Sequence, residues 1–279
     1  MPGLSRLRSF LPPILLIAMV GTIAAAVARF AVLPGGLQVA AASGKYGNSR
    51  IRTGPMSYPR EALDSDGLKV SIPQPSRRII SQSSWTDEFL YSVVPPQYII
   101  GVSPYAFDPQ ESNVLALATK YRPAVATDLE RVVRLNPDLM LVSSTGRADL
   151  ASLARAADLT VYRMYTMFTT LDQVAESIRL TGYLTGNDES ARVEEERFRS
   201  TVGRAIAMRP PDAPRPRILG LSGHLAYGRG TLLNDIIEKL GGINVAAEGG
   251  LRGYDEVNSE AMLRWNPDWI VTSADPGKA

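Results

Sequence analysis

A pattern of twelve residues that occurs twice constrains the fold of this chain more than any other feature. The copies span residues 128–139 and 258–269, and Glu, Asn, Pro and Asp recur at the same positions in both. In each copy a polar start opens a short helix, and Asn-Pro ends it, because the residue before proline avoids the α region. A buried strand follows. Each copy also lies downstream of an Arg-Ile pair, at residues 78–79 and 217–218. The repeat therefore predicts two similarly built α/β units.

The segments around both copies alternate short apolar strands with helices, which is typical of a parallel sheet covered by helices. Residues 139–142 are apolar throughout, as expected for a strand that is buried on both faces. The predicted strands lie at residues 68–72, 78–81, 99–102, 139–142, 160–162, 217–221 and 269–272. The predicted helices lie at residues 86–92, 127–135, 150–157, 232–240 and 259–265.

Two longer helices are predicted between these parts, at residues 171–185 and 188–208. The second helix would be about 30 Å long at 1.5 Å per residue. Its charged surface suits a solvent-exposed rod between two domains. We therefore expect an α/β protein with two parallel-sheet lobes bridged by one long helix. The expected boundaries are an N-terminal lobe at 68–168, a helix pair at 169–210 and a C-terminal lobe at 217–279.

The first 42 residues predict a signal peptide or a membrane anchor. Arg6 and Arg8 precede an uncharged apolar run over residues 10–28, as in a secretory signal. About 20 apolar residues are also enough to span a bilayer, so an uncleaved anchor helix is the alternative. Under both predictions the chain after this segment lies on the outer side of the membrane, because the positively charged end stays on the cytoplasmic side. Residues 43–67, rich in Gly, Ser, Arg and Pro, are predicted to be a linker.

Composition excludes several classes of site. The chain has no cysteine, which excludes disulfides, Cys-ligated zinc and iron–sulfur clusters. Its single histidine, His224, excludes a His-rich metal centre. The formal net charge is +2 and the basic residues are scattered, which argues against nucleic acid as a partner. We predict no cofactor, no metal site and no catalytic residue.

Several further motifs keep a common order and spacing. They are Arg78-Ile-Ile-Ser81 followed by Thr86 and Glu88, the two repeat copies, and the segments at residues 180–186 and 240–245. Together they resemble the iron-siderophore and cobalamin class of periplasmic binding proteins, over roughly residues 68–272. The resemblance implies two α/β lobes joined by one long helix and no enzymatic activity. It also implies capture of a small ligand between the lobes for delivery to an ABC importer.

The resemblance implies partners and a location as well. The ligand would be a ferric siderophore, cobalamin or haem, and the protein would be a monomer in the periplasm or on the outer face of the cytoplasmic membrane. Members of this class continue beyond the second Asn-Pro-Asp strand, so the C-terminal lobe is expected to be incomplete.

A glutamate on each lobe of such proteins docks against arginines of the permease, and the matching positions are Glu130 and Glu260. A purely structural role stays open for both residues. The first turn of a helix favours a carboxylate, and Thr127 and Glu130 have the spacing of a capping box.

Candidate ligand contacts follow from the rule that ligands meet the loops at the carboxyl ends of parallel strands. Aromatic rings offer flat apolar contact, arginine suits an anionic chelate, and a histidine could ligate haem iron. Each residue could instead be an ordinary half-buried or solvated side chain. The candidates are Ser84, Trp85, Tyr105, Arg147 and Tyr165 in the first lobe, and His224, Tyr227, Arg252 and Tyr254 in the second.

Two other functions are alternatives to transport. Residues 220–224, Gly-Leu-Ser-Gly-His, are similar to the nucleophile elbow of hydrolases, but the final glycine is displaced by one position. The only histidine is two residues from Ser222, which is poor geometry for a triad base. A membrane-tethered ligand sensor or adaptor with the same fold is the other alternative, and the sequence does not separate it from an importer component.

Overall fold

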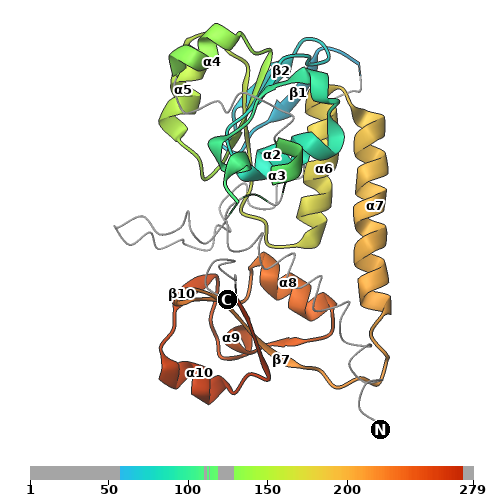
Figure 1. The fold of residues 1–279 in the computed structure, drawn as a ribbon, viewed down its shortest axis with the longest axis vertical. Helices are drawn as coiled ribbons and strands as arrows, with labels where there is room; N and C mark the ends of the chain where they lie inside the picture. The colour runs from blue at the N-terminus through green and yellow to red at the C-terminus, as the bar shows by residue number, and fades with distance from the viewer. Residues whose placement is uncertain (1–56, 110–111, 113, 119–128, 273–279) are drawn as a thin grey trace. The chain divides into compact units, whose positions relative to one another are not determined.

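The computed structural model describes residues 57–109, 112, 114–118 and 129–272 (Figure 1). The described residues form two compact units. The N-terminal unit holds residues 57–167 and 174–197, and the C-terminal unit holds residues 168–173 and 198–272. The predicted signal or anchor segment lies outside the described residues, as does Thr127 of the predicted capping box. Among the described helices, none has both the length and the apolar character needed to cross a bilayer.

The N-terminal unit opens with an antiparallel hairpin. Its strands are β1 (Arg60–Leu63) and β2 (Lys69–Ile72). Asp64 Oδ1 accepts hydrogen bonds from the backbone amides of Asp66 and Leu68, both at 2.9 Å, which closes the turn between the strands. β1 lies inside the stretch predicted to be a linker, so that prediction is wrong for residues 60–67. The charged side chain of Arg60 concealed the strand, because here an arginine faces inward.

A parallel sheet forms the centre of this unit. Its order is β4 (Ile99–Gly101), β3 (Ile79–Ser81), β5 (Leu139–Ser143) and β6 (Val161–Met164), and every pairing is parallel. All of β5 is buried, as its apolar run predicted. The expectation of an α/β fold with a parallel sheet is therefore confirmed.

Helices pack on both sides of this sheet (Figure 1). α4 (Leu129–Leu135) and α5 (Ala148–Ala156) cover one face, where Val132 and Leu150 pack with Met140 and Val142 in one apolar cluster. Burial of each such side chain contributes about 1.5–3 kcal/mol. The remaining short elements are α2 (Ser84–Val93), η1 (Pro96–Tyr98), η2 (Pro104–Phe107) and α3 (Leu115–Ala118).

The two longer predicted helices are present as α6 (Leu171–Thr185) and α7 (Asp188–Ala207). They approach closely at Gly182, where an added Cβ atom would lie 2.3 Å from the Cβ atom of Ala191. Only glycine fits this crossing. Two of the three divisions between the units fall inside these helices, before Val174 and after Arg197. The role of α7 as a bridge between two lobes stays a prediction.

The C-terminal unit contains a mixed sheet, which corrects the expectation of a second purely parallel one. β9 (Ile243–Asn244) and β11 (Trp269–Thr272) run parallel to β7 (Arg217–Ser222). β8 (Leu225–Tyr227) is antiparallel to β7, and β10 (Tyr254–Glu256) is antiparallel to β8. The helices are α8 (Leu232–Lys239), α9 (Val245–Glu248) and α10 (Ser259–Trp265).

A tight turn explains this difference. Ser222 pairs with Leu225, so only Gly223 and His224 connect the strands of the β7–β8 hairpin. Gly223 has φ +58°, in the left-handed region that such two-residue turns require. The sequence prediction took this turn for a loop leading out of a parallel strand.

Each copy of the repeat makes matching hydrogen bonds within its own unit. The Asp138 carboxylate accepts the backbone amides of Arg77 and Arg78 at 2.6 and 3.0 Å, and the Asp268 carboxylate accepts that of Arg217 at 2.8 Å. Asn136 and Asn266, which follow the last turns of α4 and α10, have φ 47° and 45°. The left-handed residue ends each helix and turns the chain into the following strand.

Candidate ligand-binding site

The first candidate loop of the N-terminal unit lies between β3 and α2. Ser83 caps the helix, and its Oγ accepts the backbone amide of Thr86 at 3.2 Å. Thr86 Oγ1 also lies 2.6 Å from Ser81 Oγ, which ties the helix turn to the end of the strand. This turn carries Ser84, which is buried, and Trp85, which is half-buried and stacks on Phe89 with ring centroids 6.3 Å apart. Capping therefore fixes the place of Trp85.

The second candidate loop follows β4 and carries Tyr105, which is 36% exposed. The loop begins at Ser103, whose backbone amide donates to Asp87 Oδ1 at 3.1 Å and whose Oγ donates to Asp87 Oδ2. Asp87 lies in the first turn of α2 and is fully buried. Burial raises the pKa of Asp87 to about 7, and the hydrogen bonds from Ser103 oppose that rise. The sequence analysis missed Asp87, although it lies between Thr86 and Glu88 of a motif it used.

The loops after β5 and β6 form a hydroxyl network. Ser143 Oγ lies 2.7 Å from Thr145 Oγ1 and 2.6 Å from Thr166 Oγ1. Arg147, at the start of α5, is exposed, and its guanidinium group pairs with Asp149. Tyr165 is half-buried, and burial raises the pKa of its hydroxyl. The predicted residues Arg147 and Tyr165 thus follow two neighbouring strands of one sheet.

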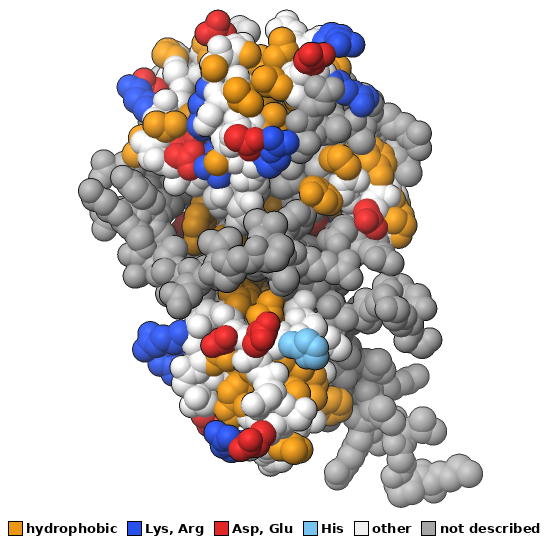
Figure 2. Space-filling model, turned by 90° about the vertical axis from the view of Figure 1, so that its left-hand side faces the viewer, with side chains coloured by type: hydrophobic (Ala, Val, Ile, Leu, Met, Phe, Trp, Pro, Cys, Tyr) orange, Lys and Arg blue, Asp and Glu red, His pale blue; other side chains and the backbone are white. Residues whose placement is uncertain are grey.

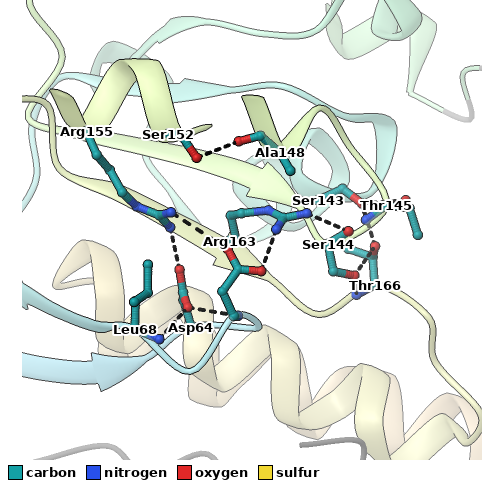
Figure 3. Close-up of polar contacts among 11 residues, drawn as sticks. Asp64, Leu68, Ser143, Ser144, Thr145, Ala148, Ser152, Arg155, Arg163 and Thr166 are labelled. Carbon is teal, nitrogen blue, oxygen red and sulfur yellow. Dashed lines mark hydrogen bonds and ion pairs between the residues drawn. The ribbon is translucent and has the colours of Figure 1, made fainter. Parts of the chain in front are cut away.

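An arginine inside β6 supports these loops (Figure 3). Arg163 is almost fully buried; its Nη2 donates to the carbonyl oxygen of Ser144 at 2.7 Å, and its Nη1 pairs with Asp66. Arg155 pairs with Asp64 at 2.5 Å and with Asp66 at 3.7 Å, so three ion pairs hold the β1–β2 turn against the rest of the unit. This role was not predictable from the sequence, since an arginine within a short strand normally faces solvent.

The predicted residues of the C-terminal unit have contrasting environments. His224 is exposed in the β7–β8 turn, and Figure 2 shows the histidine side chain, in pale blue, at the surface. Tyr227 is only 2% exposed and belongs to an apolar cluster with Ile218 and Leu233. Burial raises the pKa of Tyr227 to about 12. The half-buried ring of Tyr254 meets it edge to face with centroids 5.2 Å apart, so Tyr254 is the more accessible of the two.

Arg252 has a neighbour that the sequence analysis missed. Arg229 forms a β-bridge with it, because the amide of Arg229 donates to Leu251 O at 2.9 Å and that of Gly253 donates to Arg229 O at 2.9 Å. The two segments approach so closely that a Cβ atom at Gly228 would lie 2.3 Å from Leu251 O. Both arginines are exposed, and neither forms an ion pair with any other described residue. Their separation of 23 positions in the sequence concealed this pair of cations.

The side chains of these loops are mainly aromatic rings, hydroxyl groups and guanidinium groups. Within the described ranges, no group of three or more His, Asp or Glu side chains could hold a metal ion. The N-terminal unit offers aromatic rings and hydroxyl groups, and the C-terminal unit offers Tyr254, His224 and two exposed guanidinium groups. Such side chains suit a flat or polycyclic ligand that carries negative charge.

Glu130 and Glu260 occupy equivalent places in the two units. Each is the second residue of its helix, in α4 and α10 respectively, and each is exposed. Glu260 pairs with Arg264 at 3.1 Å across one helix turn, and its side chain is 81% exposed. The cap of α10 is Asn258, whose side chain accepts the amide of Ala261 at 2.9 Å. Since Asn258 makes the cap, Glu260 is not needed for that purpose.

The chain was compared with known proteins. The family model described as "Periplasmic binding protein" matches residues 79–278, which is more than half of the chain. The chain belongs to the periplasmic binding protein family. The resemblance inferred from its motifs is therefore confirmed.

Curated relatives of this periplasmic binding protein are named for corrinoids. The cobalamin-binding protein of Halobacterium salinarum is 28% identical over 225 residues, which cover 78% of this chain and 60% of the relative. The vitamin B12-binding protein of Pectobacterium carotovorum is 24% identical, covering 75% of this chain and 74% of the relative. The chain thus spans about 60% of the length of the halobacterial relative.

Solved structures agree on the fold. The periplasmic haem-binding protein HutB of Vibrio cholerae aligns with a TM-score of 0.61 and 20% identity, covering 72% of this chain and 77% of that one. At this identity the likeness supports the α/β architecture alone. The relatives named above are solute-binding proteins and not enzymes, which supports the expectation of no enzymatic activity, and the family implies an extracytoplasmic location.

Proposed function

We propose that this periplasmic binding protein is the substrate-binding component of an ABC importer and that its ligand is a corrinoid or an iron chelate. The observation that carries the proposal is the match of residues 79–278 to the family together with relatives named for cobalamin. A corrinoid comes first, because the curated sequence relatives bear that name. Haem and ferric siderophores are the other candidates.

The ligand contacts are assigned to loops of both units. In the N-terminal unit Trp85 and Tyr105 offer aromatic surface, and Ser84, Arg147 and Tyr165 lie on neighbouring loops. In the C-terminal unit Tyr254 offers aromatic surface, and His224 is exposed in the β7–β8 turn. Tyr227 supports Tyr254 from the core and is assigned a packing role.

The exposed pair Arg229 and Arg252 is assigned to an anionic group of the ligand. Two adjacent cations repel each other, and a phosphate or carboxylate between them relieves that repulsion. Cobalamin carries one phosphodiester, haem carries two propionates, and many ferric chelates carry carboxylates. The pair is therefore compatible with each candidate and favours an anionic ligand over a neutral one.

The proposal also includes docking and tethering. Glu130 and Glu260 are assigned to arginines of the permease, supported by their exposure and their equivalent places in α4 and α10. The N-terminal segment is assigned to export or membrane attachment, and the protein is proposed to act as a monomer.

The test is a titration of the full chain with cyanocobalamin, haemin and a ferric siderophore, followed by tryptophan fluorescence. We expect saturable binding with one ligand per chain. Trp85→Ala is expected to weaken binding about tenfold, the effect of losing an aromatic contact of about 1.4 kcal/mol. Trp269→Ala is the matched control, because Trp269 is 58% exposed on β11 and outside the assigned loops. Absence of binding to all three probes would contradict the proposal.

A further inference from the structure

We propose that Asp87 is a positioning residue for the ligand site, which fastens the loop carrying Tyr105 to the helix turn carrying Trp85 and makes ligand affinity depend on pH. The inference rests on the proposed function, because it concerns the same loops. It assigns a role to a buried group that the sequence motifs and the family match leave unexplained.

The geometry joins two loops through one carboxylate. Asp87 lies two residues after Trp85 in the first turn of α2. Its Oδ1 accepts the backbone amide of Ser103 at 3.1 Å, and its Oδ2 accepts the Ser103 hydroxyl. Ser103 in turn precedes η2, and its carbonyl oxygen accepts the amide of Ala106 at 3.2 Å. Both bonds of the carboxylate therefore hold the start of the turn that presents Tyr105.

Among the residues that the structure describes, no cation pairs with this carboxylate. Asp87, Ser103, Thr86 and Ser81 are all 0% exposed. The packed strands β3, β4 and β5 carry no ionisable side chain, and the ionisable groups of α2 and η2 are Glu88, Tyr91 and Tyr105. Of these groups, Glu88 acts on Asp87 and disfavours a second negative charge beside its own. Burial with only hydroxyl and amide donors thus raises the pKa of Asp87 to about 7.

The two protonation states hold the loop differently. The ionised carboxylate accepts both hydrogen bonds of Ser103, and such charge-assisted bonds are the stronger kind. The protonated carboxyl carries a hydrogen on one oxygen, so the bond from the Ser103 hydroxyl must reverse or break. Tyr105 is then held less firmly relative to Trp85. Ligand affinity is therefore expected to fall as the pH decreases through about 7.

The first experiment measures the affinity of the full chain for cyanocobalamin and haemin between pH 5.5 and 8.5. From high to low pH the wild type is expected to lose about three- to tenfold in affinity, the effect of one hydrogen bond. Asp87→Asn is expected to have a flat profile. Asp108→Asn is the control: its exposed carboxylate lies in the same loop, and it retains any pH dependence that belongs to the ligand. A wild-type profile in Asp87→Asn overturns the proposal.

An NMR titration of Ser103 and a Ser103→Ala variant test the role of Asp87 independently of the Asp87→Asn affinity profile. The ¹H–¹⁵N signal of the Ser103 amide is expected to titrate with a midpoint near 7 in the wild type and not in Asp87→Asn. If Asp87→Asn does not fold, Ser103→Ala replaces it, and a reduced pH dependence of affinity is expected. If no probe binds the wild type, the proposed function fails, and the Ser103 titration alone decides on Asp87. A Ser103 signal that does not titrate between pH 5 and 9 overturns the inference.

Discussion

The guanidinium group of Arg78 donates to the carbonyl oxygen of Asn136 at 2.9 Å, which joins the start of β3 to the end of α4. Arg217 makes the equivalent bond to Asn266 at 3.2 Å in the other unit. The Nη2 atom of each arginine also donates to the carbonyl oxygen of the last helical residue. The distances are 2.6 Å to Leu135 O for Arg78 and 2.8 Å to Trp265 O for Arg217. A cation at the carboxyl end of a helix satisfies carbonyl groups that lack partners and complements the helix dipole.

The aspartate of the same motif is the first test. Asp138→Ala leaves the amides of Arg77 and Arg78 without their acceptor, and we expect a loss of about 1–2 kcal/mol in the free energy of unfolding. Asp268→Ala removes the acceptor of one amide and is expected to cost less. Urea denaturation measures both. Asp212→Ala, at an exposed site, is the control, and an equal effect of all three would contradict the role of the motif.

The second prediction concerns Arg60, which is buried against α6 and α7. Its guanidinium group forms a bidentate ion pair with Asp188, with distances of 3.0 and 2.7 Å. The same group donates to the carbonyl oxygen of Tyr183 at 2.8 Å and lies 4.6 Å from the ring centroid of Tyr58. Arg60→Met is expected to destabilise the protein by about 2–3 kcal/mol, less than for a fully buried pair, because Asp188 is 31% exposed.

Two controls sharpen the Arg60 test. Arg60→Lys keeps the positive charge but loses the planar guanidinium group that forms the bidentate pair. Its loss of stability is expected to lie between those of the wild type and Arg60→Met. Arg192→Ala removes two exposed ion pairs of α7, with Glu189 and Glu196, and is expected to leave stability nearly unchanged, because solvent screens exposed pairs. Equal thermal stability of Arg60→Met and the wild type would show that the hairpin does not depend on this contact.

The third prediction uses two glycines on adjacent helices. Gly182→Ala places a Cβ atom 2.3 Å from that of Ala191, and we expect overpacking to cost about 1–3 kcal/mol. Gly203→Ala on α7 meets nothing within 4 Å and is expected to stabilise the protein by about 0.5–1 kcal/mol, because alanine favours the helix. Thermal unfolding of both variants checks the prediction. Stabilisation by both would mean that α6 and α7 do not cross so closely.

The fourth prediction follows from the ionisation of Asp87. Its folded pKa of about 7 lies above the unfolded value of 3.8, so between these pH values the folded state binds more protons. Stability is therefore highest below pH 3.8 for this group and falls as the pH rises to 7, by up to about 1.4 kcal/mol per pH unit. Urea denaturation gives the free energy of unfolding of the wild type and of Asp87→Asn at each pH, and the difference between the two isolates this contribution. A difference that does not change between pH 4 and 7 would contradict it.

The fifth prediction concerns docking. Reversing the charge at both Glu130 and Glu260 is expected to abolish uptake through the cognate permease while ligand affinity stays unchanged. A single reversal should leave partial uptake, because one contact remains. Glu189→Arg is the control, since this carboxylate is exposed on α7 and lies outside both repeats. Normal uptake by the double variant would refute docking through these residues.

Much of the architecture was predictable because its signals are local. Asn-Pro at residues 136–137 and 266–267 ends a helix through the geometry of neighbouring residues, and the apolar run of β5 predicts a strand wherever it packs. The position of Trp85 was predictable for a similar reason, since it follows a strand and opens a capped helix. The family resemblance came from the order of such local motifs.

Other features required the folded chain. The sequence analysis treated Gly223 and His224 as a ligand loop, but pairing of Ser222 with Leu225 makes them a hairpin turn. It assigned Tyr227 to the ligand, but packing places that ring in the core. Arg229 and Arg252 become neighbours only because two backbones pair.

The sequence by itself determined the helix ends marked by Asn-Pro, the buried strand β5, the recurring motif and the family to which the chain belongs. Tertiary structure decided which polar groups are buried: Arg60 against α6, Arg163 under the loops and Asp87 in the first turn of α2. The physical reason is the distance along the chain over which each interaction acts. Helix caps and proline act within a few residues, whereas desolvation depends on atoms contributed by segments far apart in the chain.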